Sequence, residues 1–177
     1  MLRVEFNASL DGHRLVSTMP IRRRGLVYKI SGHRVLARPN YKSVQIGLEA
    51  HIEENECLRY LNHSCSPNVW INAAMLECIA LRDIRPCEEL TIFYPSTEWE
   101  MSRPFICRCG APRCLRLIAG AKYLALDTLS RYVLNPHVRK AALSILSGAE
   151  PEREPNVHRG ERGVAAVGGF GLASESE

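Results

Sequence analysis

The sequence predicts a mainly β (α+β) protein whose helices are confined to its C-terminal part. Short segments rich in β-branched and aromatic residues, separated by turn residues, fill the first ninety-odd positions. The pattern changes after residue 100, where three cysteines fall within eight residues and apolar residues at helical spacing follow. A chain of 177 residues is long enough for one domain with a hydrophobic core and short appendages.

We expect eight segments of the N-terminal part to be strands, because each is four to seven residues long and rich in strand-forming side chains. They are residues 2–6, 14–18, 25–30, 33–36, 42–46, 68–72, 75–81 and 89–93. The dipeptide Ser31-Gly32 has the composition of a hairpin turn between the third and the fourth of them. The segment at 75–81 also fits a buried helix by its periodicity alone.

Two helices are expected toward the C-terminus. Residues 120–134 carry apolar side chains at helical spacing, namely Leu126, Leu129 and Val133. Asn135-Pro136 should end this helix and start the next, with Asn135 as the N-cap and Pro136 in the first helical position. The second helix runs to the Ser-Gly pair at 147–148. The remaining residues, 149–177, are rich in Pro, Gly, Glu and Arg without a period, which predicts disorder.

Composition excludes several classes of protein. No run of eighteen apolar residues is present, so no membrane span is expected. The N-terminus lacks the apolar core of a signal peptide, which predicts an intracellular protein. The seven cysteines are an odd number, so thiols or metal ligands are expected in place of a complete disulfide framework.

Charge is distributed unevenly along the chain. The net charge is +4, but residues 45–100 carry ten acidic and three basic side chains, whereas the flanking segments 1–44 and 101–150 are basic. One interpretation is an ordinary solvated surface of both signs. The other is that the acidic middle segment receives a cationic partner.

Cys107, Cys109 and Cys114 form a C-x-C-x4-C pattern around a Gly/Pro turn, which can direct three sulfurs toward one Zn²⁺ ion. A structural zinc site needs a fourth ligand, and Cys65 is the first candidate because its polar surroundings, YLNHSCSPN, give it no packing role. The rival ligands are His63 and the other cysteines, Cys57, Cys78 and Cys87. A nucleophilic Cys65 assisted by His63 is the competing chemistry, but a third orienting group is missing nearby.

Three motifs in this order resemble the signature of SET-domain protein lysine methyltransferases with a post-SET zinc segment. They are NHSCSPN at 62–68, EELTIFY at 88–94 and CRCGAPRC at 107–114. The segments IRRRGLVYKI and NECLRYLNHSC are also similar to parts of that family, and the resemblance covers residues from about 10 to 118.

The resemblance implies a SET fold of small twisted sheets with a pseudoknot. It divides the chain into a SET domain (1–100), a post-SET zinc-binding segment (101–118), C-terminal helices (119–147) and a disordered tail (148–177). It implies S-adenosyl-L-methionine and Zn²⁺ as cofactors and Tyr94 as the catalytic residue. The cofactor-binding residues that it implies are Gly12, Arg14, Asn62, His63, Tyr94, Phe105 and Leu115. The metal ligands are Cys65, Cys107, Cys109 and Cys114.

The sequence departs from the family pattern in three places. The N-terminal cofactor loop usually reads Gly-x-Gly, and here Arg14 takes the place of the second glycine after Gly12. Arginine prevents the close backbone approach that glycine allows, although its charge could face the cofactor carboxylate. Ile92 stands where an aromatic residue often limits the number of methyl groups, and Phe93 replaces a frequent acidic residue.

The expected function is methyl transfer from S-adenosyl-L-methionine to a lysine side chain of a protein, histone or non-histone. An acidic rim would favour a lysine within a basic peptide segment as partner. The alternative is a catalytically silent SET-fold module for protein interaction. Nucleic-acid binding through the basic segments 21–25 and 101–150 is a weaker idea, because the β-type context offers no groove-reading helix.

Overall fold

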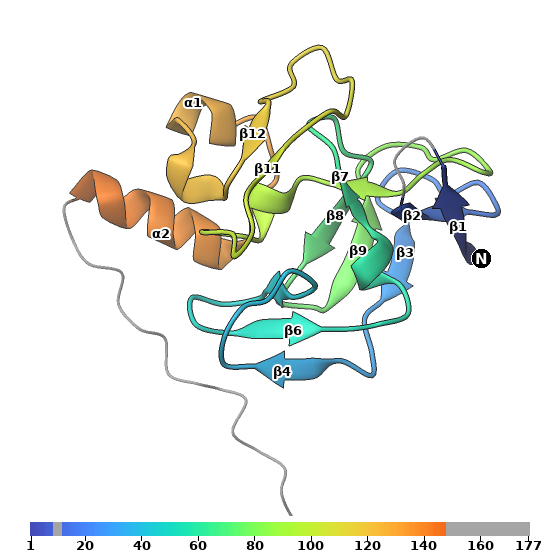
Figure 1. Ribbon diagram of the computed structural model, residues 1–177, viewed down its shortest axis with the longest axis horizontal. Helices are drawn as coiled ribbons and strands as arrows, with labels where there is room; N and C mark the ends of the chain where they lie inside the picture. Colours follow the sequence, from blue (N-terminus) through green and yellow to red (C-terminus); the bar gives the residue numbers. More distant parts are fainter. Residues whose placement is uncertain (9–11, 148–177) are drawn as a thin grey trace, which may run out of the picture.

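The computed structural model describes residues 1–8 and 12–147, and the tail predicted to be disordered lies outside this range. Figure 1 shows small sheets on one side of the molecule and the helices on the other. The strands are β1 (Leu2–Asn7), β2 (Gly12–Ser17), β3 (Leu26–Lys29), β4 (Arg34–Leu36), β5 (Val44–Gln45), β6 (His51–Glu53), β7 (Asn62–His63), β8 (Val69–Asn72), β9 (Glu77–Ala80), β10 (Thr91–Ile92), β11 (Phe105–Ile106) and β12 (Leu117–Ile118). The helices are the 3₁₀ helices η1 (Leu58–Tyr60), η2 (Tyr94–Ser96) and η3 (Ala121–Tyr123), and the α-helices α1 (Leu126–Leu129) and α2 (Pro136–Ser147).

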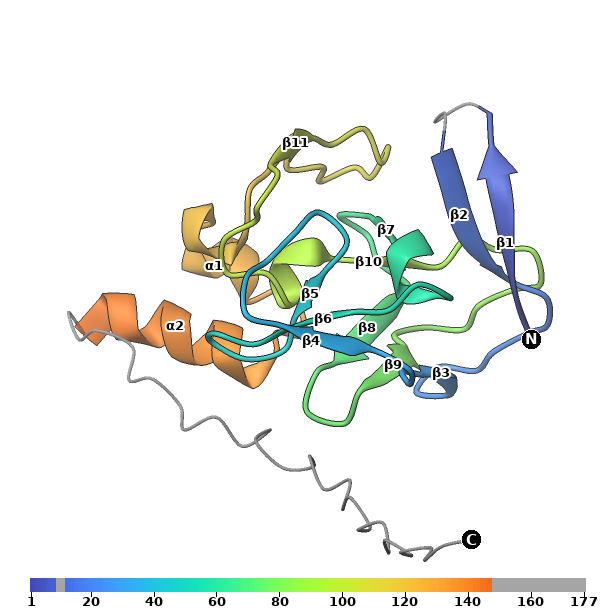
Figure 2. The same ribbon diagram turned by 60° about the horizontal axis from the view of Figure 1, so that its bottom comes forward.

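The strands form five small sheets, as expected for a SET fold. Two have three strands, in the orders β3-β9-β8 and β4-β6-β5, and three are pairs, β1-β2, β11-β12 and β7-β10. All pairings are antiparallel except that of β7 with β10. Figure 2 shows the β1-β2 hairpin at one end of the molecule, helices α1 and α2 at the other, and the β11 hairpin between them.

Each of the eight segments predicted to be strands overlaps an observed strand, and the strand within residues 75–81 excludes the helix alternative there. The predicted hairpin at Ser31-Gly32 is wrong, because β3 pairs with β9 whereas β4 pairs with β6. Gly32 does adopt the positive φ of a turn, +63°, but the turn carries the chain from one sheet to another. The short strands β6, β7, β11 and β12 were not expected from periodicity, since two or three residues give too little pattern to detect.

One hydrophobic core lies between the central sheets. It includes Leu15 of β2, Ile52 of β6, Ile71 of β8 and Leu90 before β10, each at most 1% exposed. Burying such a side chain contributes about 1.5–3 kcal/mol. Strands that are too short to be stable alone are therefore held by packing across sheets as well as by their hydrogen bonds.

The C-terminal helices only partly match the prediction. Helix α2 begins at Pro136 and ends at Ser147, as expected, but residues 120–134 form η3 and the single turn α1 instead of one continuous helix. The chain passes so close to the Trp99 carbonyl oxygen at Gly120 that a Cβ atom there would lie 2.5 Å from it. Val133 is 47% exposed and does not continue an apolar helix face. Among the described residues, no helix is long and apolar enough to cross a membrane.

Asn135 has a larger role than that of a helix cap. Its side chain is fully buried, and its Oδ1 accepts a hydrogen bond from the Ala73 N–H at 2.9 Å. Its Nδ2 donates to the carbonyl oxygens of Ile71, at 2.8 Å, and Ser96, at 3.0 Å. Asn135 therefore ties the start of α2 to β8 and to the segment that follows Tyr94.

The parallel pairing of β7 with β10 positions the two central motifs. Asn62 lies opposite Thr91, and His63 lies opposite Ile92, so the NHSC segment runs alongside the segment that ends at Tyr94. The buried side chain of Asn68 reinforces this contact, because its Oδ1 accepts from the Thr91 N–H at 2.8 Å. Its Nδ2 donates to the Glu89 carbonyl oxygen at 2.7 Å.

We predict that Asn135→Ala lowers the free energy of unfolding by about 2–4 kcal/mol, since it removes three hydrogen bonds to buried backbone groups. Urea denaturation followed by circular dichroism measures the change. The control is Asn55→Ala, at an exposed asparagine, which should shift the stability by less than about 0.5 kcal/mol. Equal stability of the two variants would contradict the cross-linking role of Asn135.

Candidate active site and metal centre

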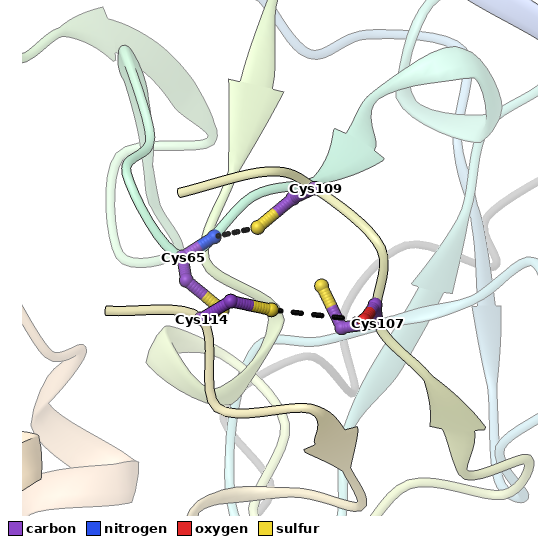
Figure 3. A group of neighbouring side chains, drawn as sticks. All are labelled: Cys65, Cys107, Cys109 and Cys114. Carbon is purple, nitrogen blue, oxygen red and sulfur yellow. Dashed lines mark hydrogen bonds between the residues drawn. The ribbon is translucent and has the colours of Figure 1, made fainter. Parts of the chain in front are cut away.

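Four cysteines meet at one point, as Figure 3 shows. The sulfurs of Cys65, Cys107, Cys109 and Cys114 all lie within 4.8 Å of one another, and Cys65 and Cys107 are buried. Cys65 comes from the turn after β7, and the other three cysteines come from the β11-β12 hairpin. The predicted convergence of Cys65 with the distant trio is therefore confirmed.

The remaining cysteines do not join this cluster. Cys78 is buried in the main core, Cys57 is half-buried beside it and Cys87 is exposed. Burial raises the pKa of the Cys57 thiol to about 11, and that of Cys78 also rises, so both are neutral packing thiols.

The donor set fits a tetrahedral metal ion. A zinc–sulfur bond of about 2.3 Å places the sulfurs of a tetrahedron about 3.8 Å apart, within the observed limit. Backbone N–H groups also point at the sulfurs: the N–H of Cys65 donates to Cys109 Sγ and the N–H of Leu115 to Cys65 Sγ, both at 3.4 Å. Such hydrogen bonds stabilise thiolate, the form that binds metal.

The electrostatics of Cys109 agree with this role. Burial opposes its ionisation, but hydrogen bonds from the N–H groups of Cys65 and Ala111 and from the neighbouring thiols outweigh it and lower the pKa of Cys109 to about 6. The pKa of Cys65 is raised to about 11, mainly by burial. Four adjacent thiols cannot all ionise without a compensating positive charge, which a divalent cation would supply.

His63 connects the cysteine cluster to Tyr94. Its Nδ1 accepts a hydrogen bond from the Tyr94 N–H at 3.2 Å, which leaves the proton on Nε2, 3.3 Å from Cys65 Sγ. His63 is thus a hydrogen-bond partner of a cluster thiol and not one of the four converging ligands. Burial lowers the pKa of His63 to about 4, so its ring is neutral near pH 7.

The Tyr94 hydroxyl is held in place on the other side of this histidine. It donates a hydrogen bond to the Leu61 carbonyl oxygen at 3.0 Å. Burial, with a smaller contribution from the charge of Glu98, raises the pKa of Tyr94 to about 12. The phenol therefore stays protonated near pH 7 and cannot act there as a base.

Tyr94 lines a cavity of about 250 Å³ between the 40–44 segment, η1 and the 101–105 segment. Ile92 and Leu61 supply apolar walls beside it. Ile92 thus lines the same cavity as Tyr94, and its effect on the number of methyl groups stays a prediction. Phe93 faces elsewhere: it lines a separate cavity and stacks on Tyr132, with ring centroids 3.6 Å apart.

Asn62 links the Gly12–Arg14 segment, which is expected to bind the cofactor, to the NHSC motif. The Asn62 Nδ2 donates to the His13 carbonyl oxygen at 3.0 Å and to Glu89 Oε1 at 2.9 Å, so the Gly12–Arg14 segment lies against the NHSC motif. Arg14, however, pairs with Glu5 of the neighbouring strand, with 2.9 Å between Nη2 and Oε2. Its charge is therefore already compensated within the β1-β2 hairpin.

Phe105 and Leu115 line different cavities. The Phe105 ring contacts His63 and Tyr94 edge-on, with centroids 5.7 and 5.9 Å apart, and lines the Tyr94 cavity. Leu115 packs on the cysteine cluster and lines the cavity of Phe93. The structure thus groups Phe105 with Tyr94 and His63, whereas Leu115 packs on the same cysteine cluster but lines the other cavity.

Glu98 is the residue of this region that sequence reasoning missed. It lines the Tyr94 cavity, is only 9% exposed, and its Oε1 accepts a hydrogen bond from the Gln45 N–H at 2.8 Å and one from the Thr97 hydroxyl at 3.2 Å. Burial raises its pKa to about 7 despite these hydrogen bonds. The available signal was a lone acid four residues after Tyr94 in an otherwise uncharged stretch, FYPSTEW.

We predict that Glu98 makes the protein less stable as the pH rises. An unfolded glutamate titrates near pH 4.3 and folded Glu98 near 7, so between these values the folded state holds a proton that the unfolded state has lost. Glu98→Gln removes this pH dependence. The free energy of unfolding of the variant, relative to that of the wild type, should therefore rise by on the order of 1–3 kcal/mol between pH 4.5 and pH 8. Urea denaturation at both pH values tests this, and a constant difference would contradict it.

Comparison with known proteins shows what this chain is similar to. The SET domain family model matches residues 12–95. Methyltransferase flvH of Aspergillus flavus is 49% identical over 105 residues, which cover 58% of this chain and 58% of that protein. Human Histone-lysine N-methyltransferase 2B is 38% identical over 66 residues, covering 34% of this chain and 2% of that protein. The chain thus spans less than two thirds of the length of each.

Solved structures show the same fold. The crystal structure of KRYPTONITE in complex with mCHH DNA, H3(1-15) peptide and SAH has a TM-score of 0.50 and 25% identity, covering 66% of this chain and 29% of that one. The methyltransferase domain of human SETMAR has a TM-score of 0.50 and 19% identity, covering 67% and 58%. The matched residues, the relative at 49% identity and this fold together show that the chain has a SET fold and is similar to SET-domain methyltransferases.

Proposed function

We propose that this protein transfers a methyl group from S-adenosyl-L-methionine to the side-chain amine of a lysine in a protein. The observation that carries the proposal is the setting of Tyr94. Its hydroxyl is fixed by Leu61, its backbone is held by His63, and it lines a cavity wide enough for a linear amine side chain.

The relatives support this choice of reaction and substrate. The relative at 49% identity is named a methyltransferase, and the human relative a histone-lysine N-methyltransferase. KRYPTONITE was crystallised with both SAH, the demethylated product of S-adenosyl-L-methionine, and an H3 peptide. A protein lysine is therefore the acceptor that fits best, and an intracellular location remains a prediction.

Several residues are placed to hold the cofactor. The Oδ1 of Asn62 accepts no hydrogen bond from another described residue and is free to accept one from a ligand. The backbone of the Gly12–Arg14 segment lies beside it, and Phe105 offers an aromatic surface. When bound, the cofactor supplies an electrophilic methyl group on a positively charged sulfur.

Tyr94 contributes alignment and not proton transfer. In-line displacement depends on how closely the donor carbon, the acceptor nitrogen and the leaving sulfur are aligned, so fixed surroundings account for much of the acceleration. The Tyr94 hydroxyl donates a hydrogen bond to the Leu61 carbonyl oxygen. The lone pairs of the hydroxyl oxygen therefore stay available for weak CH···O contacts with a methyl group. The neighbouring Leu61 carbonyl is a second such acceptor.

The acceptor amine must be neutral to attack. A free lysine titrates near pH 10.4, and burial beside a cationic sulfonium lowers this value through desolvation and like charge. Leu61 and Ile92 are 3% exposed and provide the apolar wall for this desolvation.

We further propose that Cys65, Cys107, Cys109 and Cys114 bind one structural Zn²⁺. A closed set of four sulfur ligands leaves no open coordination position for catalysis. The ion would fix the β11-β12 hairpin, and thus Phe105, against the turn that follows His63.

A catalytically silent interaction module is the second candidate. The observation that favours it is the pairing of Arg14 with Glu5, at a position where the family pattern expects a glycine. Cofactor binding separates the two: the enzyme must bind S-adenosylhomocysteine, whereas a silent module has no need to retain this site.

We predict that Tyr94→Phe reduces kcat by at least about a hundredfold and changes the affinity for S-adenosylhomocysteine by less than about threefold, because the hydroxyl acts on alignment. Radiolabelled methyl transfer to lysine peptides and isothermal titration calorimetry measure the two quantities. Tyr123→Phe, at an exposed tyrosine, is the control and should retain full activity. Equal kcat in Tyr94→Phe and wild type would contradict a catalytic role of the Tyr94 hydroxyl.

We predict about one Zn²⁺ per chain in protein purified without chelator. Cys65→Ser should lose most of this metal and lower the melting temperature, because it removes one ligand of a closed site. Cys87→Ser is the control, since Cys87 is exposed and outside the cluster. Elemental analysis measures the stoichiometry, and full zinc content in Cys65→Ser would exclude Cys65 as a ligand.

A further inference from the structure

The charges that line the Tyr94 cavity differ from the acidic rim expected from the sequence. Three cationic side chains lie in its wall: Lys42, Arg59 and Arg103. Glu98 is the one carboxylate among the residues that line it. The acidic residues of the middle segment are mostly used elsewhere, as in the pair of Glu88 with Arg82. A basic peptide would therefore meet like charge here.

Glu98 retains the capacity to bind a ligand. Both of its side-chain hydrogen bonds, from the Gln45 N–H and the Thr97 hydroxyl, reach Oε1. Its Oε2 accepts no hydrogen bond and forms no ion pair within the described part of the chain. A carboxylate held at one oxygen in the wall of a cavity, with the other oxygen unused, is suited to accept a hydrogen bond from a ligand cation.

None of the three cations forms a salt bridge with a carboxylate among the described residues, although the charge of Lys42 acts on Glu53. Lys42 lies over the Tyr41 ring and Arg59 over the Tyr60 ring, with 5.2 and 5.1 Å from the charged group to the ring centroid. Within residues 1–8 and 12–147, neither side chain forms a salt bridge, and neither does Arg103. Arg59 and Arg103 are exposed, which places their charges at the surface, whereas Glu98 is buried.

We propose that the Tyr94 cavity selects a lysine flanked by acidic residues, with the lysine ammonium bound by Glu98 and the acidic flanks by Lys42, Arg59 and Arg103. This proposal rests on the proposed function, since it names the sequence context of the methyl acceptor. The charge of residues 45–100 predicted a lysine in a basic peptide segment as the partner, and the proposal names a lysine in an acidic segment instead.

The arrangement separates two steps of recognition. Acidic flanks would be attracted by the exposed arginines during approach, an effect that falls with ionic strength. The amine would then enter past Leu61 and Ile92 as an ammonium group and meet an anionic group only inside the cavity. This ion pair serves recognition, and the amine must lose a proton before it can attack a methyl group. A side chain of similar shape but without charge would leave the buried carboxylate without its partner, which is the basis of selectivity for lysine.

Binding should strengthen as the pH rises through neutrality, because Glu98 must be ionised to pair with an ammonium group and burial raises its pKa to about 7. Tyr94 stays neutral near this pH, since its pKa is raised to about 12. The other charged groups that line the cavity are Lys42, Arg59 and Arg103. His137, on α2, contacts the Thr97 carbonyl oxygen, and its replacement by Asn is therefore a control for the pH profile.

The first test compares two peptides that carry one central lysine and differ only in the flanking residues, Asp in one and Arg in the other. Binding to the zinc-loaded protein is measured by fluorescence anisotropy, with and without S-adenosylhomocysteine. We expect the Asp-flanked peptide to bind at least about tenfold more tightly at low salt. The variant Arg59→Gln/Arg103→Gln should lose this preference, whereas Arg22→Gln/Arg23→Gln, at exposed arginines outside the cavity, should keep it.

The second test concerns Glu98 alone. Wild-type protein should bind the Asp-flanked lysine peptide more tightly than its norleucine analogue, and Glu98→Gln should abolish this difference together with its pH dependence. Glu100→Gln is the matched control, because Glu100 lies two residues away, is exposed and pairs with Lys122. A purely structural Glu98 would leave the preference for lysine over norleucine unchanged, since glutamine can still accept both hydrogen bonds at Oε1.

Equal or tighter binding of the Arg-flanked peptide would overturn the proposal, and so would a lysine preference that survives Glu98→Gln. Failure of the protein to bind S-adenosylhomocysteine would instead count against the proposed function. The peptide comparison without cofactor would then still decide whether the cavity selects acidic flanks.

Discussion

The parallel pairing of β7 with β10 is the constraint on which the site depends. In this pair, Asn62 lies opposite Thr91 and His63 lies opposite Ile92. The pairing brings the NHSC segment against the strand that leads to Tyr94, and His63 then contacts both the Tyr94 N–H and Cys65 Sγ. One two-residue pairing thus joins the cavity, the Gly12–Arg14 segment of β2 and the cysteine cluster into a single site.

Much of this arrangement could be predicted, and the reasons are physical. Alternating and β-branched patterns located the strands, and a cysteine without apolar neighbours, Cys65, pointed to a distant partner. The hairpin at Ser31-Gly32 was wrong because a turn signal fixes a local reversal and does not choose the strand that pairs. The cross-links of Asn135 could not be foreseen, since its partners lie far away in the sequence.

The charge of a segment proved a poor guide to the charge of the cavity. The acidic residues of 45–100 largely pair with nearby bases or backbone groups, while cations from three separate segments converge beside Tyr94. The net charge of a segment averages over all its residues, whereas a cavity is lined by single side chains from several segments. The same reasoning explains why Glu98 escaped notice: its importance comes from burial beside the 40–44 segment and not from its neighbours in sequence.

The central claim, that Tyr94 and its cavity methylate a lysine amine, is tested most directly by mass spectrometry of the reaction product. Zinc-loaded protein is incubated with S-adenosyl-L-methionine and a lysine peptide, and fragmentation locates any added methyl group. The account predicts the added mass on the lysine side-chain nitrogen, and its absence when norleucine replaces that lysine. Protein that holds zinc and binds the cofactor product, yet leaves every peptide and protein acceptor unmodified, would contradict it.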